Sequence, residues 1–343
     1  MASVIYLTDT RYGQRAWQHP SARHRCYHYA DALLFQGANA SVLPIDQVTG
    51  AVLKGVDHVI FHRPVLSKRF SRAINYCRDA DVQIHADYDD LIFNPDFASY
   101  SPQHISGGKD IVKVQQQFES THSAAQCFNS FLVSTAYLSD KLRALFPAAA
   151  ITVLPNSLPR TFAAPGRSSR NSGKLTIGYF PGSRGHGEDF NSISMVLREV
   201  LRSGVKLLLV GRMNKQVYKD LPNVTHYPFA SYSDYLHLLS CVDVSIAPLL
   251  DNEFNRSKSA VKLIESVSVG TPIVASNNQD MLDHDNELSW LVSSTQEWEE
   301  TLENVLHKNT LDINNEPIVG QVQQRFSVLN RLSILHDHLR CVA

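Results

Sequence analysis

Apolar residues in the first half of the chain alternate between short runs and longer stretches with helical spacing. Runs of strand length occupy residues 4–7, 41–45, 58–62, 82–86, 131–134 and 151–154. Helical spacing marks residues 22–35, 67–77 and 111–127, and Gly37 is a helix-stop signal after the first of them. Strands that alternate with helices pair in parallel through right-handed crossovers, so we predict a doubly wound α/β domain.

A second alternating series follows a segment without apolar periodicity. Residues 163–173 are rich in Ala, Pro, Gly, Ser and Arg, which is typical of an interdomain linker. Strands are then predicted at 175–180, 205–210, 244–247 and 272–275, and helices at 192–202, 233–239 and 257–267. We therefore expect two Rossmann-like domains, residues 1–160 and 174–318, that face a central cleft. Residues 319–343 have apolar positions at helical spacing and are expected to cross back to the first domain.

Composition narrows the class of protein. A chain of 343 residues is long enough to form two hydrophobic cores. Its content of 43% apolar and 19% charged residues excludes a disordered chain. Lys and Arg number 32 against 33 Asp and Glu, a net charge of −1 without a basic tract, so no nucleic-acid partner is expected. Five widely spaced cysteines without a CxxC argue against a disulfide framework and a zinc ribbon. No apolar run approaches the roughly 18 residues that span a bilayer, and no basic flank opens the chain, so a cytoplasmic location is expected.

Ligands of open α/β sheets bind beyond the C-terminal ends of the strands. The turn after the strand at 175–180 is rich in glycine and carries Gly182, Arg184 and His186 before a predicted helix. The glycines would let a ligand approach the backbone closely, and the amides of the helix N-terminus and the two basic side chains would bind a phosphate there. The pattern is neither GxGxxG nor a P-loop, so no nicotinamide cofactor is expected. The alternative interpretation is a plain turn with exposed basic residues.

A charged stripe follows the strand at 244–247. If the chain is helical from Ser257, then Lys258, Lys262 and Glu265 share one face. Lys258 and the amides at Ser257 and Ser259 would meet an anion, and Glu265 would accept hydrogen bonds from a ribose diol. The alternative is a solvated face with ordinary ion pairs.

Two candidate positions lie in the first half. His85, Asp87, Asp89 and Asp90 gather at the end of the strand at 82–86, where clustered charge raises at least one pKa and suits a base or a sugar contact. A metal site is disfavoured, because strand-end carboxylates commonly cap turns. The segment 11–28 is basic and aromatic, which suits an anionic or glycan acceptor, and Arg25 is its best cleft-facing candidate. The alternative there is a solvated loop and helix start.

These residues together resemble a known family. The run NRSKSAVKLIESVSVGTPIVAS at 255–276 is similar to the donor-site helix and following E-x-x-x-x-G-x-P-V-V-A-S run of glycosyltransferase family 4, which has the GT-B fold. Residues 153–157 resemble the strand and Asn that end the N-terminal domain in this family, and residues 178–190 resemble the first turn of its C-terminal domain. Residues 87–91 resemble a D-x-D-D-L element of polysaccharide-building members.

The resemblance implies that the second half binds a nucleotide-activated sugar and the first half a glycan or lipid-linked glycan acceptor. Glu265 would hold the ribose as the second Glu of the E-x7-E motif, whereas the first Glu is replaced by Ser257. We assign Arg184, His186, Arg212, Lys258, Ser259 and Lys262 to the diphosphate side, and Arg25 and His85 to the acceptor side. No metal or other cofactor is expected, since these groups stabilise the leaving phosphate.

The family implies retention of anomeric configuration, with the leaving phosphate accepting the proton of the acceptor. An inverting reaction would use Asp87, Asp89 or Asp90 as the base. A role in bacterial surface polysaccharide synthesis, with peripheral membrane association, also follows from the resemblance. Three alternatives stay open: a catalytically inactive GT-B module that binds a nucleotide sugar or glycan, a nucleotide-sugar 2-epimerase, and a two-lobed solute-binding protein.

Overall fold

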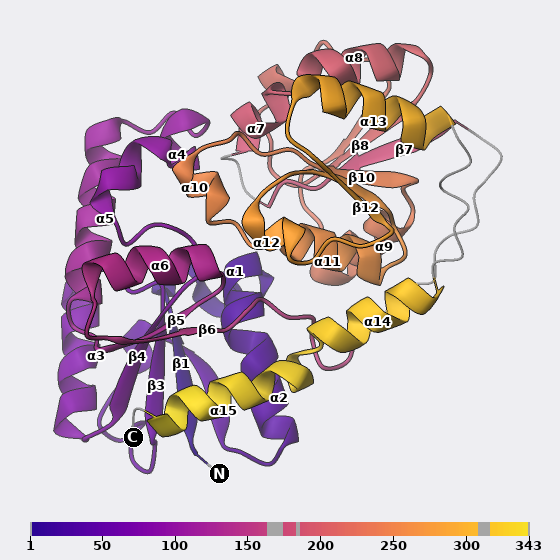
Figure 1. The fold of residues 1–343 in the computed structure, drawn as a ribbon. Coiled ribbons are helices and arrows are strands. Elements are labelled where there is room, and N and C mark those ends of the chain that lie inside the picture. Colours follow the sequence, from indigo (N-terminus) through magenta and orange to yellow (C-terminus); the bar gives the residue numbers. More distant parts are fainter. Residues whose placement is uncertain (1, 163–173, 183–185, 308–315, 342–343) are drawn as a thin grey trace.

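The protein consists of two α/β domains joined by two chain crossings, as the computed structural model shows (Figure 1). The structure describes residues 2–162, 174–182, 186–307 and 316–341. Each domain has a parallel six-stranded sheet with helices packed on it. The predicted doubly wound α/β class is thereby confirmed, and the proposed linker at 163–173 lies outside the described residues.

The N-terminal sheet has the strand order β2-β1-β3-β4-β5-β6. Its strands are β1 (Val4–Thr8), β2 (Ala40–Pro44), β3 (His58–His62), β4 (Gln83–Tyr88), β5 (Ser130–Val133) and β6 (Ala150–Val153). Its helices are α1 (Pro20–Ala22), α2 (His28–Phe35), α3 (Lys68–Asp79), α4 (Pro102–Ile105), α5 (Ile111–Ala125) and α6 (Ala136–Leu145). A π-helical turn over Arg23–Tyr27 joins α1 to α2, and Gly37 ends the stretch at φ +82. Gly37 therefore has the left-handed conformation that a helix-stop glycine supplies.

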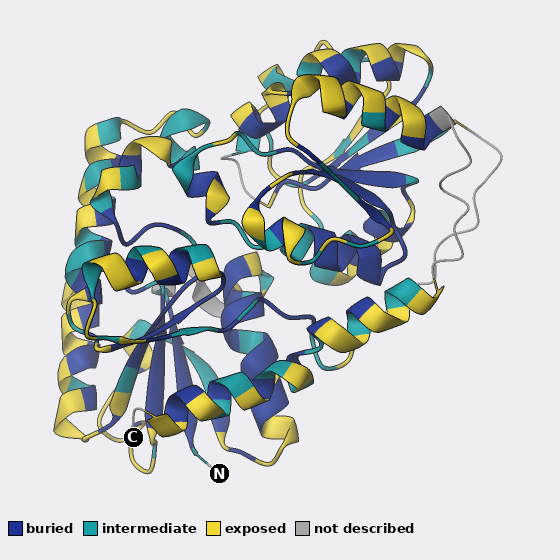
Figure 2. Ribbon diagram, viewed as in Figure 1, coloured by how far each residue is buried: buried dark blue, intermediate teal, exposed yellow. Residues whose placement is uncertain are grey.

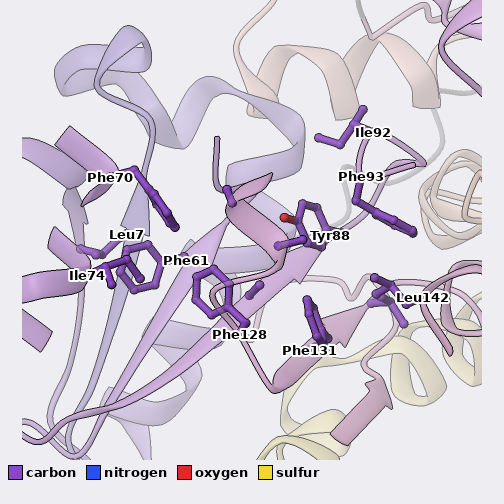
Figure 3. Packing of buried hydrophobic residues seen from close by; sticks show 14 of the residues in the cluster. Leu7, Phe61, Phe70, Ile74, Tyr88, Ile92, Phe93, Phe128, Phe131 and Leu142 are labelled. Atoms are coloured by element: carbon purple, nitrogen blue, oxygen red, sulfur yellow. The ribbon is translucent and has the colours of Figure 1, made fainter. Parts of the chain in front are cut away.

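Aromatic side chains fill the core on one face of the N-terminal sheet. Phe61, Phe70, Phe128 and Phe131 form a continuous set of ring contacts, with centroid separations of 5.4–6.4 Å between successive rings (Figure 3). All four are at most 2% exposed. Burial on both faces explains why the strands read as apolar runs in the sequence.

The C-terminal sheet has the order β12-β11-β10-β7-β8-β9. Its strands are β7 (Thr176–Tyr179), β8 (Lys206–Val210), β9 (Val224–Tyr227), β10 (Val244–Ala247), β11 (Ile273–Ser276) and β12 (Ser289–Val292). Its helices are α7 (Gly187–Asn191), α8 (Ser194–Arg202), α9 (Tyr232–Ser240), α10 (Glu253–Arg256), α11 (Val261–Ser268), α12 (Gln279–Leu282) and α13 (Thr295–His307). β9 and β12, which the apolar pattern does not predict, are the two edge strands. An edge strand has fewer buried positions, so its apolar signal is weak.

The last segment passes from one domain to the other. In α14 (Glu316–Phe326), Val322 and Phe326 pack against the C-terminal core, whereas Leu332 and Leu339 of α15 (Leu332–Cys341) pack against the N-terminal core. Both helices combine exposed positions with buried or intermediate ones (Figure 2). Leu158, in the other crossing, donates its amide to the Phe326 carbonyl at 2.8 Å, so the two crossings are hydrogen-bonded to each other. Within the described residues no helix combines the length and apolarity needed to cross a membrane.

Candidate functional site

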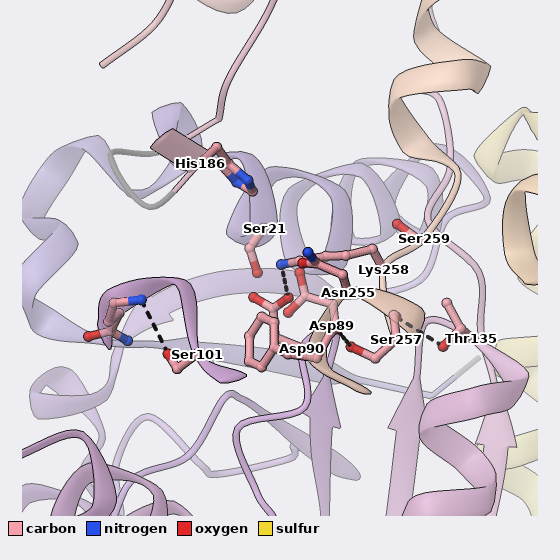
Figure 4. A network of polar contacts seen from close by, with 12 residues as sticks. Ser21, Asp89, Asp90, Ser101, Thr135, His186, Asn255, Ser257, Lys258 and Ser259 are labelled. Carbon is pink, nitrogen blue, oxygen red and sulfur yellow. Dashed lines mark hydrogen bonds and ion pairs between the residues drawn. The ribbon is translucent and has the colours of Figure 1, made fainter. Parts of the chain in front are cut away.

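The loops that follow β4 and β10 meet where the two domains touch. Asp89 and Asp90 come directly after β4, and the segment after β10 leads through α10 to Lys258. Nζ of Lys258 lies 2.5 Å from Oδ1 of Asp90, and Oγ1 of Thr135 donates to the carbonyl of Ser257 at 3.3 Å (Figure 4). The C-terminal strand ends of both sheets therefore converge on one polar network, as expected for a ligand site in open α/β sheets.

The predicted continuous helix at 257–267 is wrong. Asn252 caps the separate short helix α10, and α11 begins only at Val261, so Lys258 lies in the connection between them. The amide of Ala260 donates to the carboxylate of Asp280 at 2.6 Å, and Asn278 donates to the Lys258 carbonyl at 3.3 Å. Side chains from a segment twenty residues away thus break the helix and place an acidic group at the start of α11, where the sequence predicted a bound anion.

Lys262 and His186 stand with Lys258 on the C-terminal side of the network. The Lys262 ammonium lies 5.5 Å from the centroid of the Tyr179 ring. Burial, together with the charge of Lys258, lowers the pKa of Lys262 to about 8. Nδ1 of His186 lies 2.9 Å from Asp189, and burial lowers the pKa of His186 despite this carboxylate. The two lysines supply positive charge, and the His186 ring, neutral in this arrangement, can add a hydrogen bond, so the three side chains together are suited to a diphosphate.

Glu265 is buried and joins the two domains. Its Oε1 lies 3.3 Å from Nε2 of His24, and its Oε2 accepts a hydrogen bond from the Tyr235 hydroxyl at 2.8 Å. Burial alone would raise the pKa of Glu265, but the contacts with His24, Arg23 and Tyr235 lower it to about 2. The carboxylate is therefore ionised and able to accept hydrogen bonds, and its present partner on the acceptor side is His24.

Arg25 does not face a ligand, and this corrects the prediction. It is 0% exposed, and its guanidinium contacts Asp87 through Nη2 at 2.9 Å and Nε at 3.0 Å. The same group donates to the Leu154 carbonyl and to Oδ1 of Asn156. The π-helical turn directs Arg25 into the domain rather than out of it. Asp87, also 0% exposed, is held by this pair, and burial raises its pKa to about 6. Neither is available as a base or an acceptor contact in this arrangement.

Asp89 and Asp90 differ from Asp87 in their partners. Arg63 contacts both of them, through Nε to Asp89 and through Nη2 to Asp90 at 2.5 Å. Although burial opposes ionisation, the Arg63 charge and the nearby His62 hold the pKa of Asp89 well below its usual value. The predicted rise in pKa within the acidic cluster is found at Asp87, where burial is the main cause. Asp90 is the carboxylate that reaches across to the C-terminal domain.

His85 lies away from this network and is not an acceptor contact. It is 0% exposed and bonds His58 at 3.1 Å, His338 at 3.2 Å and the Ser130 hydroxyl at 2.7 Å. His338 belongs to α15, so the cluster attaches the C-terminal helix to the sheet. Position 85 is in the middle of β4, whereas ligand contacts come from the strand end.

The remaining predicted residues lie in three settings. Oγ of Ser259 accepts from Nδ2 of Asn156 at 2.8 Å, which is another contact between the domains. Gly182 and Arg212 are exposed after β7 and β8, with open space around Gly182. Arg184 lies outside the described residues. No group of three His, Cys, Asp or Glu side chains suited to a metal occurs in the described part of the chain.

Sequence reasoning missed the residues that pair with the predicted ones. His24, Tyr235 and Asp189 contact Glu265 and His186, and Tyr232 stacks under the Arg23 guanidinium at 3.8 Å. The density of His and aromatic residues in 11–28 was the signal for His24, and Tyr235 lies 30 residues from Glu265 without a signal of its own. Asp189 lies only three residues after His186, so that spacing could have indicated the pair.

The site coincides with a recognised domain. Residues 186–308 match the family model described as "Glycosyl transferases group 1". The C-terminal domain is therefore similar to the group 1 glycosyl transferases. It contains His186, Lys258, Lys262 and Glu265. No curated protein matches the chain.

Solved structures similar to the whole chain share its two-domain fold. A sucrose-phosphate synthase from Thermosynechococcus elongatus aligns over 100% of both chains with a TM-score of 0.68 and 12% identity. WaaG, a glycosyltransferase involved in lipopolysaccharide biosynthesis, aligns over 99% of both chains with a TM-score of 0.62 and 11% identity. Anabaena HepE, solved with UDP and glucose, aligns over 99% of this chain and 100% of its own, with a TM-score of 0.61 and 14% identity. The expected GT-B fold is confirmed, and the family model with these neighbours supports a glycosyltransferase.

Proposed function

We propose that the protein transfers a sugar from a nucleotide-activated donor to a glycan or lipid-linked glycan acceptor. The single observation that carries this proposal is that Lys258 and Glu265, within the stretch that matches group 1 glycosyl transferases, contact the N-terminal domain, with Lys262 between them in the sequence. Glu265 is ionised and suited to a ribose diol, and the two lysines are suited to the diphosphate.

Charge development explains the work of the basic side chains. As the bond between the anomeric carbon and the diphosphate breaks, negative charge grows on the leaving phosphate. Lys258, Lys262 and His186 surround the place where this charge would lie, so they stabilise it without a metal or other cofactor. In a retaining reaction, the acceptor oxygen bonds to the anomeric carbon on the same face and its proton passes to the leaving phosphate. No protein base is then required, consistent with the engagement of Asp87 and Asp89 by arginines.

UDP is the first nucleotide to test. The structurally similar HepE was solved with UDP and glucose, and a pneumococcal O-GlcNAc transferase of similar fold was solved with UDP and GlcNAc. WaaG acts in lipopolysaccharide biosynthesis. On this basis we infer a role in bacterial surface polysaccharide synthesis, such as O-antigen or capsule, in the cytoplasm at the membrane surface.

The experiment is a transfer assay with the full chain. UDP-, GDP-, dTDP- and CMP-sugars are incubated with and without glycan acceptors, and nucleotide release is measured. We expect one donor class to be consumed faster when an acceptor is present. Lys258→Ala should lower the rate by about 10²–10³, the usual cost of losing a group that stabilises transition-state charge. Lys215→Ala, an exposed lysine of the same domain, is the matched control.

A catalytically inactive module that binds the same nucleotide sugar is the second candidate. Ser257 stands where the family has the first Glu of its motif, and its hydroxyl donates to the Phe254 carbonyl within the chain. In that case a nucleotide binds and Glu265 is needed for it, but none of the donors is consumed in the presence of any acceptor.

A further inference from the structure

Asp189 is the centre of a buried hydrogen-bond network that includes His186. It lies in the short helix α7 and is 3% exposed. Its Oδ1 accepts hydrogen bonds from the Leu250 amide at 3.0 Å and from Nδ2 of Asn255 at 2.8 Å. Its Oδ2 lies 2.9 Å from Nδ1 of His186. One carboxylate therefore joins the start of α7 to the segment that follows β10, and it also holds the His186 ring.

The partners of Asp189 determine which nitrogen of His186 carries a proton. The Leu250 amide can only donate, and Nδ2 of Asn255 also donates to the Leu250 carbonyl at 3.0 Å, which fixes the orientation of that side-chain amide. Burial would raise the pKa of Asp189, but the hydrogen bonds from His186, Leu250 and Asn255 lower it, so the carboxylate is ionised and only accepts. Nδ1 of His186 must therefore carry the proton in this contact.

This arrangement leaves Nε2 as the ring nitrogen that a ligand would contact. The His186 side chain is 13% exposed and that of Asp189 is 5% exposed, so the ring is the more accessible part of the pair. In a neutral ring with its proton on Nδ1, Nε2 is a hydrogen-bond acceptor. The oxygens of a diphosphate also only accept. A hydrogen bond from Nε2 to a phosphate oxygen therefore needs a second proton on the ring.

Charged groups from α7, α11 and the connection before α11 act on His186. Burial is the main cause that lowers its pKa, the charges of Lys262 and Lys258 add to this effect, and Asp189 opposes it. The Tyr179 hydroxyl donates to the His186 carbonyl at 3.3 Å, and the Lys262 ammonium lies 5.5 Å from the centroid of the Tyr179 ring, so His186 and Lys262 both adjoin Tyr179. A diphosphate bound at the two lysines would favour a charged ring, because it offsets their positive charge and adds negative charge.

From this geometry we infer that Asp189 is a positioning residue for His186. It holds the ring so that Nε2 takes up a proton from solvent when the donor diphosphate binds, and Nε2 then donates a hydrogen bond to a phosphate oxygen. No bond of the donor breaks in this step, and the product is an imidazolium paired with the Asp189 carboxylate. The inference rests on the proposed function, since it describes how the same donor site binds its diphosphate.

The test measures the protons taken up when UDP binds, by calorimetry at pH 7 in buffers of different ionisation enthalpy. The terminal phosphate of UDP is mostly ionised at this pH, because the second pKa of a phosphate group is about 6. Lys262, with a pKa of about 8, is mostly protonated. We expect the wild type to take up about one proton for each UDP bound, since histidine is the side chain that changes charge in this range. His186→Gln should take up almost none.

Asp189→Asn distinguishes positioning from a merely structural role. The oxygen of the new amide can still accept from Leu250 and Asn255, which leaves its NH₂ group facing Nδ1 of His186. Nδ1 must then accept, so the neutral ring carries its proton on Nε2 and can bond a phosphate without a second proton. We expect this variant to bind UDP with similar affinity but almost no proton uptake. Nitrogen NMR spectra of the His186 ring should show the Nδ1–H form in the wild type and the Nε2–H form in the variant.

Glu188→Gln is the matched control, because Glu188 is the exposed acidic neighbour of Asp189 in α7. This variant should match the wild type in both UDP affinity and proton uptake. If Asp189→Asn does not fold, the proton uptake of His186→Gln and the ring spectra of the wild type decide the question.

The outcomes separate this inference from the proposed function. UDP binding without proton uptake in the wild type, or uptake that persists in His186→Gln, would overturn the inference and leave the proposed function intact. The same holds if folded Asp189→Asn keeps the proton uptake or loses UDP binding. Absence of nucleotide binding to the wild type would count against the proposed function. In that case an Nε2–H form in the wild-type ring spectra would overturn the positioning role of Asp189, and an Nδ1–H form would support it.

Discussion

Asp90 of the N-terminal domain holds Lys258 of the C-terminal domain by an ion pair of 2.5 Å between Oδ1 and Nζ. Both side chains are largely buried, at 15% and 21% exposure. The lysine that we assign to the donor diphosphate is thus already paired with a carboxylate from the acceptor side. A donor phosphate must compete with Asp90 for this ammonium.

Asp90→Asn should therefore strengthen nucleotide binding. An ion pair of this exposure is worth about 1 kcal/mol, so its loss should improve the affinity for the nucleotide diphosphate about fivefold. Calorimetry on the variant measures this directly, with Asp96→Asn, an exposed aspartate of the same domain, as the control. Unchanged or weaker binding would show that Asp90 does not compete for Lys258.

Arg25 and Asp87 should behave as a structural pair. Removing one partner leaves a buried charge alone, so Arg25→Met or Asp87→Leu should each lower the free energy of unfolding by roughly 3–5 kcal/mol. The double variant should recover much of the loss, because neither charge is then left unpaired. Denaturant unfolding measures all three. If Arg25→Met instead left stability unchanged and weakened acceptor binding, a ligand-contacting role for Arg25 would be restored.

Lys262 should make nucleotide binding pH-dependent. Its pKa of about 8 means that the ammonium loses its proton as the pH rises through this value, so affinity for an anion should fall between pH 7 and pH 9. Lys262→Arg keeps its charge over this range and should flatten the profile. Identical profiles for the two proteins would exclude Lys262 from the anion site.

The histidine cluster under α15 should make the protein sensitive to acid. Burial lowers the pKa of His85 to about 3 and that of His338 to about 4, from a usual value of 6.5. The unfolded chain therefore takes up protons first as the pH falls, and stability is lost below about pH 6.5. At pH 5 the loss is about 2 kcal/mol for each histidine. Unfolding of His338→Gln between pH 7 and pH 5 should show a shallower loss than the wild type, and equal slopes would rule out this linkage.

Most of the fold could be predicted because its buried strands have continuous apolar runs. β3 and β10 match the predicted bounds, and the other predicted strands differ by one or two residues at one or both ends. The helix at 257–267 failed because Asp280 and Asn278, brought close by the sheet, interrupt it. No local pattern carries that information.

The candidate site was only partly predictable, because contacts between residues distant along the chain leave no local sequence pattern. Lys258, Lys262 and Glu265 are near one another in the sequence, and the structure brings Lys258 and Glu265 into contact with the N-terminal domain, while Lys262 lies beside Tyr179 of its own domain. Arg25 was misread because an arginine is usually exposed, and its pairing with Asp87 depends on a π-helical turn and a strand 62 residues away. His24, the partner of Glu265, comes from the other domain.

Binding of UDP to the wild type and to Glu265→Gln tests the central claim, that the nucleotide binds at Glu265 in the C-terminal domain, most directly. Loss of a charged hydrogen-bond acceptor for the ribose should cost about 1.5–3 kcal/mol, which is a loss of affinity of more than tenfold. Glu253 also contacts the N-terminal domain, through Lys141. Glu253→Gln breaks that contact and is the matched control, so it should bind UDP as the wild type does. Equal UDP affinity in the wild type and Glu265→Gln, or no binding of any nucleotide to the wild type, would contradict the account.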